Sequence, residues 1–128
     1  MGWLHTWQML RVLFARRAAG IKYPQLYAEK SEAEESPTAM YFNCAQRAHM
    51  NTLENTPHVL MGILFTGLKF PYVAAGLGAS WLTGRIIYTV CYTSNGPERR
   101  LLSAFSQMGL LTAASYTAFC FIRDEFEF

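Results

Sequence analysis

Residues Leu101–Ile122 read LLSAFSQMGLLTAASYTAFCFI, and this stretch of 22 residues contains no charged side chain. At about 1.5 Å per residue, a helix of this length spans roughly 33 Å, enough to cross a hydrocarbon core of about 30 Å. Its Ser, Thr, Gly and Ala residues are typical of helices that pack together in a membrane. The alternative is a buried core helix, but a chain of 128 residues rarely builds a soluble core around so long a helix. The stretch therefore predicts an all-α integral membrane fold.

Two further apolar segments precede it. Asn55–Leu68 continues a helix that carries Arg47 and Glu54, and Pro71–Thr93 is apolar except for Arg85. An arginine at bilayer depth costs about 2.5–3.5 kcal/mol on insertion scales, so Arg85 is a candidate functional residue. The alternative is a structural role, in which Arg85 clamps neighbouring helices, for example through Glu54.

The amino-terminal segment, residues 1–20, reads MGWLHTWQMLRVLFARRAAG and carries Arg11, Arg16 and Arg17 beside an apolar face. It lacks the basic region before an apolar core that marks a signal peptide. We interpret it as the cytosolic end of a first membrane helix whose beginning is short or missing. An amphipathic helix lying in the membrane interface is the alternative. Residues 1–128 are therefore expected to form one transmembrane domain.

The distribution of charge predicts the connections and the orientation. Ala28–Thr38, AEKSEAEESPT, is acidic and lacks apolar periodicity, so we predict a solvated connecting loop. By the positive-inside rule, the side of the array with more Lys and Arg faces the cytosol. That side carries Arg16, Arg17, Lys22, Lys30, Arg47, Arg99 and Arg100, and the other carries Lys69 and Arg123. Because the arginines are scattered among the spans, no nucleic acid partner is expected.

Two polar faces lie on these apolar helices. Within YFNCAQRAHMNTLENTP (residues 41–57), Arg47, Asn51 and Glu54 fall at i, i+4 and i+7 and so share one face of a helix. A second face has the spacing i, i+3 and i+7 and consists of Arg85, Tyr88 and Tyr92. In a chain that is 52% hydrophobic and 16% charged, such faces indicate a binding site. The alternative is that they are structural clamps.

The residue types indicate the ligand. Arginines at the cytosolic end of the helices suit carboxylates through charge-assisted hydrogen bonds. Glu54 suits an ammonium group, and Asn51 and the tyrosines add neutral hydrogen bonds. A small zwitterionic peptide with additional carboxylates fits this set.

The three cysteines indicate neither a metal site nor a catalytic thiol. Cys44, Cys91 and Cys120 show no metal-ligand spacing, so no metal is expected. Cys44 and His49 are one alternative as a catalytic pair, but residues five apart lie on different faces of a helix. No phosphate-binding loop, GxSxG turn or HExxH motif is present in the sequence.

Three segments carry a family resemblance: ARRAAGIKYPQLYA (residues 15–28), FNCAQRAHMNTLEN (residues 42–55) and GLGASWLTGRIIYTVCYTSNGPERR (residues 76–100). They resemble the membrane-associated proteins in eicosanoid and glutathione metabolism, the MAPEG family, and most of all its type 3 microsomal glutathione S-transferases. The resemblance extends over Ala15–Ile122. It implies a homotrimer in the endoplasmic reticulum membrane, with the active site toward the cytosol, in which each subunit is an all-α transmembrane four-helix bundle. The outer mitochondrial membrane is the alternative location.

The resemblance also implies a glutathione site between neighbouring subunits. Its implied glutathione-binding residues are Arg16, Arg47, Asn51, Glu54, Arg85, Tyr88 and Tyr92. Two arginines are implied to be catalytic, Arg99 next to the sulfur and Arg17 near the acceptor. A thiol with a pKa of about 8.5 is mostly protonated at neutral pH, and a nearby guanidinium favours the thiolate.

Glutathione is then the co-substrate that is conjugated to a lipophilic electrophile or that reduces a lipid hydroperoxide, and membrane lipid surrounds the acceptor. Asn55 departs from the family's leukotriene-forming synthase, which has a tyrosine at this position. One alternative is a non-catalytic lipid-binding scaffold like the lipoxygenase-activating proteins. Another is a small ion-conducting or assembly-factor membrane protein, in which the face formed by Arg47, Asn51 and Glu54 is structural.

Overall fold

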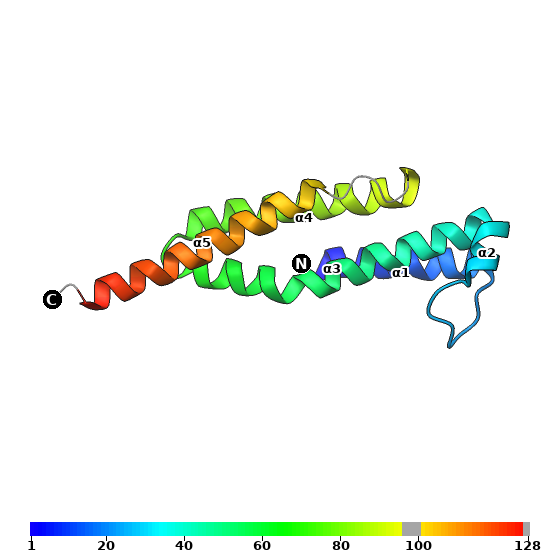
Figure 1. The fold of residues 1–128 in the computed structure, drawn as a ribbon, viewed down its shortest axis with the longest axis horizontal. Coiled ribbons are helices and arrows are strands. Elements are labelled where there is room, and N and C mark those ends of the chain that lie inside the picture. The colour runs from blue at the N-terminus through cyan, green and yellow to red at the C-terminus, as the bar shows by residue number, and fades with distance from the viewer. Residues whose placement is uncertain (96–100, 127–128) are drawn as a thin grey trace. The chain divides into compact units, whose positions relative to one another are not determined.

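A computed structural model describes residues 1–95 and 101–126, and this part of the chain is helical without strands. The helices are, in order, α1 (Gly2–Ala19), α2 (Lys30–Glu35), α3 (Pro37–Gly67), α4 (Pro71–Asn95) and α5 (Leu101–Phe126) (Figure 1). The predicted all-α class is confirmed. The four long helices cover the four segments that the sequence predicted to be helical.

Helix α1 ends where a glycine takes a left-handed conformation. Gly20 has φ 70°, which a residue without Cβ adopts at little cost. The backbone N–H of Gly20 donates to the carbonyl of Arg17 (3.2 Å), and that of Ile21 donates to the carbonyl of Arg16 (3.3 Å). These bonds satisfy carbonyl groups that the helix itself leaves open.

Helix α2 corrects the prediction of a solvated loop over Ala28–Thr38. A capping box starts this helix, because the Glu32 carboxylate accepts a hydrogen bond from the backbone N–H of Glu29 (2.7 Å). The Glu29 side chain in turn caps the first turn of the helix. Such a reciprocal cap satisfies donors that a short acidic segment would otherwise leave to water. Only Ser36 separates α2 from α3, which begins at Pro37.

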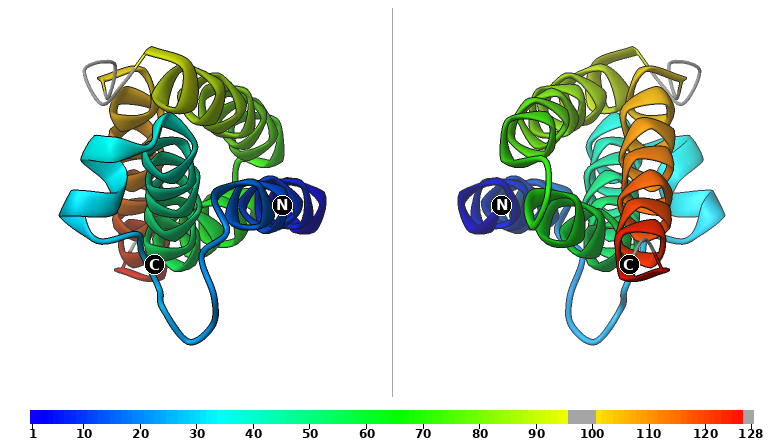
Figure 2. Two further views of the ribbon diagram at one scale, coloured as in Figure 1. Left: turned by 90° about the vertical axis from the view of Figure 1, so that its right-hand side faces the viewer. Right: turned by 90° about the vertical axis from the view of Figure 1, so that its left-hand side faces the viewer.

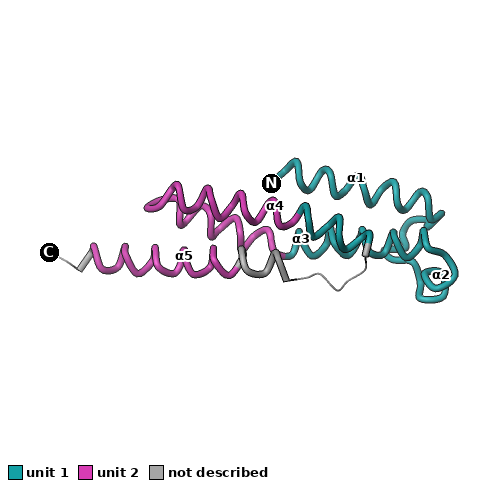
Figure 3. Tube along the Cα trace, turned by 90° about the horizontal axis from the view of Figure 1, so that it is seen from above, with its two compact units in different colours: residues 1–54, 86–100 teal, residues 55–85, 101–128 magenta. Residues whose placement is uncertain are grey.

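The chain forms two compact units (Figure 3). Unit 1 consists of Met1–Glu54 and Ile86–Arg100, and unit 2 consists of Asn55–Arg85 and Leu101–Phe128. Helices α3 and α4 each contribute one half to each unit, so this division does not test the prediction of a single domain. The four-helix bundle likewise stays a prediction.

In unit 1, α1 packs against the first half of α3 through alanines and a phenylalanine. Ala15 of α1 belongs to the same buried cluster as Phe42 and Ala45 of α3. Residues 20–29 connect the end of α1 to the start of α2 and loop outward from the helices (Figure 2). Ile21 and Ala28 of this connection are buried in the same cluster. The two ends of this connection are therefore part of the core of unit 1.

In unit 2, the second half of α3 and the first half of α4 form a hairpin against which α5 packs. The hairpin turn includes a hydrogen bond from the N–H of Phe70 to the carbonyl of Thr66 (2.8 Å). A Cβ on Gly78 would lie 3.0 Å from Ile63 Cδ1, so a glycine at this position allows α3 and α4 to approach closely. The indole of Trp81 is fully buried in the unit.

Within residues 1–95 and 101–126, no helix combines the length and the apolar character needed to cross a membrane. Charged residues lower the mean hydropathy of two helices, Arg47 and Glu54 in α3 and Arg85 in α4.

Candidate functional site

The first polar face lies on α3 in unit 1. The Arg47 guanidinium donates a hydrogen bond to Glu54 Oε1, with 3.1 Å between Nη1 and Oε1. This ion pair lies on the side of α3 that the spacing predicted. The side chains are 49% and 51% exposed, respectively, so both charges remain accessible to a ligand. The hydrogen bond to Glu54 and its negative charge hold the pKa of Arg47 above its usual value.

The two tyrosines of the second face lie in unit 1 and are buried against α3. Tyr88 and Tyr92 are one turn apart on α4, and their ring centroids are 5.4 Å apart. They form a cluster with Ala48, against which Cys44 also packs. Because α3 has a small residue at position 48, the tyrosine rings fit between the two helices. Unit 1 thus brings together the tyrosines and the helix that carries Arg47.

Arg85, the third residue of that face, lies in unit 2. It is buried, and its guanidinium carbon is 5.2 Å from the centroid of the Trp81 ring. This distance fits a cation–π contact. Glu54, which the sequence suggested as a partner of Arg85, is paired with Arg47.

Arg16 makes contacts within its own unit. Its guanidinium donates hydrogen bonds to the carbonyl oxygens of Gln25 (2.6 Å) and Leu26 (3.5 Å). The same group lies over the rings of Tyr23 (4.4 Å) and Phe42 (4.6 Å). These contacts attach the connection between α1 and α2 to the helices. Arg16 therefore has a structural role in unit 1.

The two predicted catalytic arginines differ in what the structure says of them. Arg17 lies in the last turn of α1 and is exposed. Arg99 lies outside the described residues, as does its neighbour Arg100.

The geometry around Cys44 does not favour a reactive thiol. Burial raises the pKa of the Cys44 thiol, so the thiolate is disfavoured. Burial, and to a lesser extent the charge of nearby His5, lowers the pKa of His49. His49 lies 3.4 Å from Gln8, measured from Nδ1 to Oε1. In the described residues, no group of three His, Cys, Asp or Glu side chains could hold a metal ion.

Sequence reasoning missed a buried polar network in unit 1. The side-chain amide of Gln8 donates hydrogen bonds to the hydroxyls of Thr52 (2.9 Å) and Thr89 (2.7 Å). These three residues come from α1, α3 and α4. A glutamine in an otherwise apolar part of α1 was the available indication, but a single polar residue has no periodicity to interpret.

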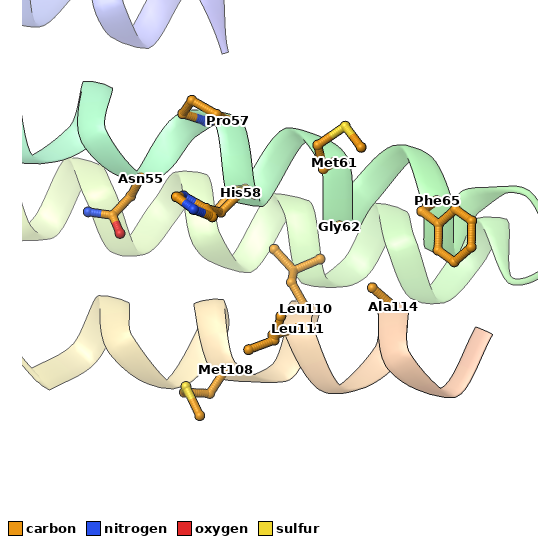
Figure 4. A pocket seen from close by; sticks show the side chains of 11 residues that line it. Asn55, Pro57, His58, Met61, Gly62, Phe65, Met108, Leu110, Leu111 and Ala114 are labelled. Atoms are coloured by element: carbon orange, nitrogen blue, oxygen red, sulfur yellow. The ribbon is translucent and has the colours of Figure 1, made fainter. Parts of the chain in front are cut away.

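A cavity of about 630 Å³ lies in unit 2 between α3 and α5 (Figure 4). Asn55 and His58 lie toward one end of it, and the rest of the wall is almost entirely apolar (Figure 4). The lining residues are Asn55, Pro57, His58, Val59, Met61, Gly62, Phe65, Met108, Leu110, Leu111 and Ala114. The volume lies within the range of about 300–1,000 Å³ that is usual for small-molecule sites.

Comparison with known proteins identifies the family. The model of the MAPEG family matches residues 1–120. The uncharacterized protein sll1147 of Synechocystis sp. (strain ATCC 27184 / PCC 6803 / Kazusa) is 38% identical over 77 residues, which is 57% of this chain. The matched part is 56% of that relative, so the chain spans about half its length. No solved structure matches the chain. The match over residues 1–120 shows that this chain belongs to the MAPEG family, whose members are membrane proteins and include both glutathione transferases and non-catalytic proteins.

Proposed function

We propose that this chain is a microsomal glutathione transferase of the type 3 kind, which conjugates glutathione to lipophilic electrophiles or reduces lipid hydroperoxides. The observation that carries the proposal is the half-exposed ion pair of Arg47 and Glu54 on α3, in a member of this family. Glutathione carries two carboxylates and one ammonium group. Such a ligand can open the ion pair without leaving a charge unpaired, because its carboxylate takes the place of Glu54 beside Arg47 and its ammonium group takes the place of Arg47 beside Glu54.

The proposed roles follow from the chemistry of the side chains. Arg47 binds a glutathione carboxylate, and Glu54 binds the ammonium group. Asn51 and the hydroxyls of Tyr88 and Tyr92 contribute neutral hydrogen bonds. Arg16 and Arg85 complete the proposed set. To reach a tripeptide in a neighbouring subunit, Arg16 would have to leave its two carbonyl acceptors.

Arg99 is the proposed thiolate-stabilising residue, and Arg17 is the second arginine near the acceptor. A guanidinium next to the sulfur lowers the pKa of the thiol, and each unit corresponds to about 1.4 kcal/mol of stabilisation of the anion. In conjugation, the thiolate forms a carbon–sulfur bond and the leaving group departs with its electron pair. With a hydroperoxide, the thiolate attacks the distal oxygen and the O–O bond breaks, which gives glutathione sulfenic acid and an alkoxide that takes a proton from water to become the alcohol. A second glutathione then converts the sulfenic acid to the disulfide and water.

The cavity of unit 2 supports a lipophilic acceptor, since an alkyl chain fits an apolar wall. Large apolar side chains are also exposed on three helices, for example Leu64, Tyr72 and Phe119. Exposed apolar surface of this extent suits lipid or neighbouring subunits. We therefore propose a homotrimer in the endoplasmic reticulum membrane, with the glutathione site toward the cytosol. The outer mitochondrial membrane is the alternative location.

Titration calorimetry of purified protein with glutathione tests the proposal. We expect saturable binding, together with thiolate absorbance near 240 nm at neutral pH (a wavelength typical of thiolates generally). S-methylglutathione, which has no ionisable thiol, should bind without this absorbance. Absence of glutathione binding in folded, assembled protein would overturn the proposal.

The cavity also supports a second function, that of a non-catalytic lipid-binding scaffold. Leu111 and Leu64 offer a matched pair, because they are 61% and 60% exposed and only Leu111 lines the cavity. In a transferase, Leu111→Trp should raise the KM for a long-chain acceptor roughly fivefold by overfilling the cavity, and Leu64→Trp should not. In a scaffold, lipid binding would show the same difference while glutathione binding is absent.

A further inference from the structure

One side chain of α1 joins the three long helices of unit 1. Gln8 is 1% exposed, and its Nε2 donates hydrogen bonds to Thr52 Oγ1 of α3 (2.9 Å) and to Thr89 Oγ1 of α4 (2.7 Å). These two bonds use both hydrogens of the amide nitrogen. Thr52 and Thr89 are themselves buried. The network is therefore shielded from water and ties α1 to two other helices at one level.

A second tie lies one turn further along α1. Nη2 of Arg11 donates hydrogen bonds to the hydroxyl of Tyr41 on α3 (2.8 Å) and to Oγ1 of Thr93 on α4 (3.0 Å). Thr93 follows Thr89 by four residues, so α4 presents two threonines on the face toward α1. Two side chains of α1 thus hold two successive turns of α4.

These ties decide which way α4 is rotated about its axis. Thr89 and Thr93 directly follow Tyr88 and Tyr92, and successive residues of a helix point about 100° apart. When the threonines face α1, the tyrosines face α3, where they pack against Ala48. A purely apolar interface would tolerate other rotations. A buried hydroxyl or amide that loses its partner costs free energy, and this cost selects one rotation.

We propose that Gln8 is a positioning residue of the glutathione site, which acts through Thr52 and Thr89 to aim Tyr88 at α3. The proposal rests on the proposed function, because it assigns this rotation to a glutathione-binding face. Thr52 also directly follows Asn51, so the same amide holds the helix that carries the first polar face. Gln8 itself touches no substrate.

Two variants remove the tie, and two others are matched controls. Gln8→Leu removes the amide at similar volume, and Thr89→Val replaces only a hydroxyl, so it keeps the test valid if Gln8→Leu does not fold. Thr89→Ser restores the hydroxyl at the same position. Thr6→Val removes an exposed hydroxyl of α1 that bonds to its own helix at the carbonyl of Gly2.

Two measurements separate positioning from a general structural role. The first is the set of tyrosine ring signals in ¹³C NMR without glutathione, assigned with Tyr88→Phe and Tyr92→Phe. The second is the KM for glutathione at saturating acceptor. In Gln8→Leu and Thr89→Val we expect shifted ring signals and a KM for glutathione raised roughly 5- to 10-fold, the effect of about one lost buried hydrogen bond. The kcat and the KM for the acceptor should stay near wild type, as should all values for Thr89→Ser and Thr6→Val.

Unchanged ring signals in both Gln8→Leu and Thr89→Val would overturn the proposal. So would shifted signals with an unchanged KM for glutathione, or a fall in kcat alone, which is what loss of folded protein produces. If wild-type protein does not bind glutathione at all, the proposed function fails. Shifted ring signals would then still show that Gln8 sets the rotation of α4, but the assignment of that rotation to a glutathione site would be overturned.

Discussion

Different kinds of contact hold the helices together inside each of the two units. In unit 1, polar side chains of α1 reach α3 and α4, as Gln8 and Arg11 do. In unit 2, small residues allow close approach, as Gly78 does against Ile63, and the space between α3 and α5 is an apolar cavity. Directed hydrogen bonds select one arrangement of helices, whereas apolar contacts depend mainly on the volume that they fill. Unit 1 is therefore suited to a ligand with defined polar groups, and unit 2 to a range of apolar ones.

The largest effect is expected from removing a core side chain of unit 2. Trp81 is 0% exposed, and Trp81→Ala should lower the free energy of unfolding by about 3–5 kcal/mol, since a large cavity remains. Trp3, 88% exposed, supplies the control Trp3→Ala, which should have little effect. Relative to wild type, the Trp81 variant should accelerate amide hydrogen exchange more in α5 than in α1. Equal acceleration in both helices would contradict the division into two units.

Next in size is the loss of the accessible ion pair of unit 1. Arg47→Ala or Glu54→Ala should weaken glutathione binding about 10- to 150-fold, since a hydrogen bond to a charged group contributes roughly 1.5–3 kcal/mol. Acceptor preference should not change. Lys30 and Glu34 form an exposed ion pair of the same kind on α2, with 3.7 Å between Nζ and Oε1, and Lys30→Ala is the control.

Calorimetry of assembled variants measures this difference. If glutathione binds the Arg47 and Lys30 variants equally well, the ion pair of α3 is a structural clamp. The distinction between the two units would then concern packing only.

A smaller effect is expected at Arg99, the proposed thiolate-stabilising residue. Arg99→Ala should raise the pKa of bound glutathione by about one unit, equivalent to roughly 1.4 kcal/mol, and lower turnover while affinity changes little. Arg100→Ala should do much less, although the two arginines are adjacent. Thiolate absorbance titrated against pH measures both. An unchanged titration in the Arg99 variant would transfer the role to Arg17, or end the enzymatic interpretation if neither variant shifts it.

The smallest effect concerns an exposed ion pair of unit 2. Hydrogen bonds from Lys69 and Arg123 lower the pKa of Asp124 below its ordinary value of 3.8. A carboxyl with a lowered folded-state pKa stabilises the fold above its unfolded pKa, and the contribution is lost as pH falls through the folded value. Asp124→Asn should therefore melt slightly below wild type at neutral pH, with the difference vanishing below the ordinary Asp range. A difference that persists in acid would exclude the carboxylate as its cause.

Much of the helical layout was predictable from the sequence, and part of the site was not. Apolar periodicity and proline positions are local, so α3 and α4 follow from them. Helix α2 was missed because a capping box in an acidic segment resembles a solvated loop when hydropathy alone is considered. The contacts of Arg16 with the Gln25 carbonyl and the Phe42 ring could not be predicted in this way. Which carbonyls and rings lie around an arginine depends on residues distant in the chain.

The sequence by itself determined the helical class and the polar face of Arg47 and Glu54 on α3, because both depend on spacing along a single helix. Only the tertiary structure decided that Gln8 joins three helices and that Tyr88 lies against Ala48. The physical reason is that a helix repeats along its own axis, and this repeat specifies which residues share a face. Which side chains meet across helices depends on the rotation and register of each helix, and these arise only when all the helices pack together.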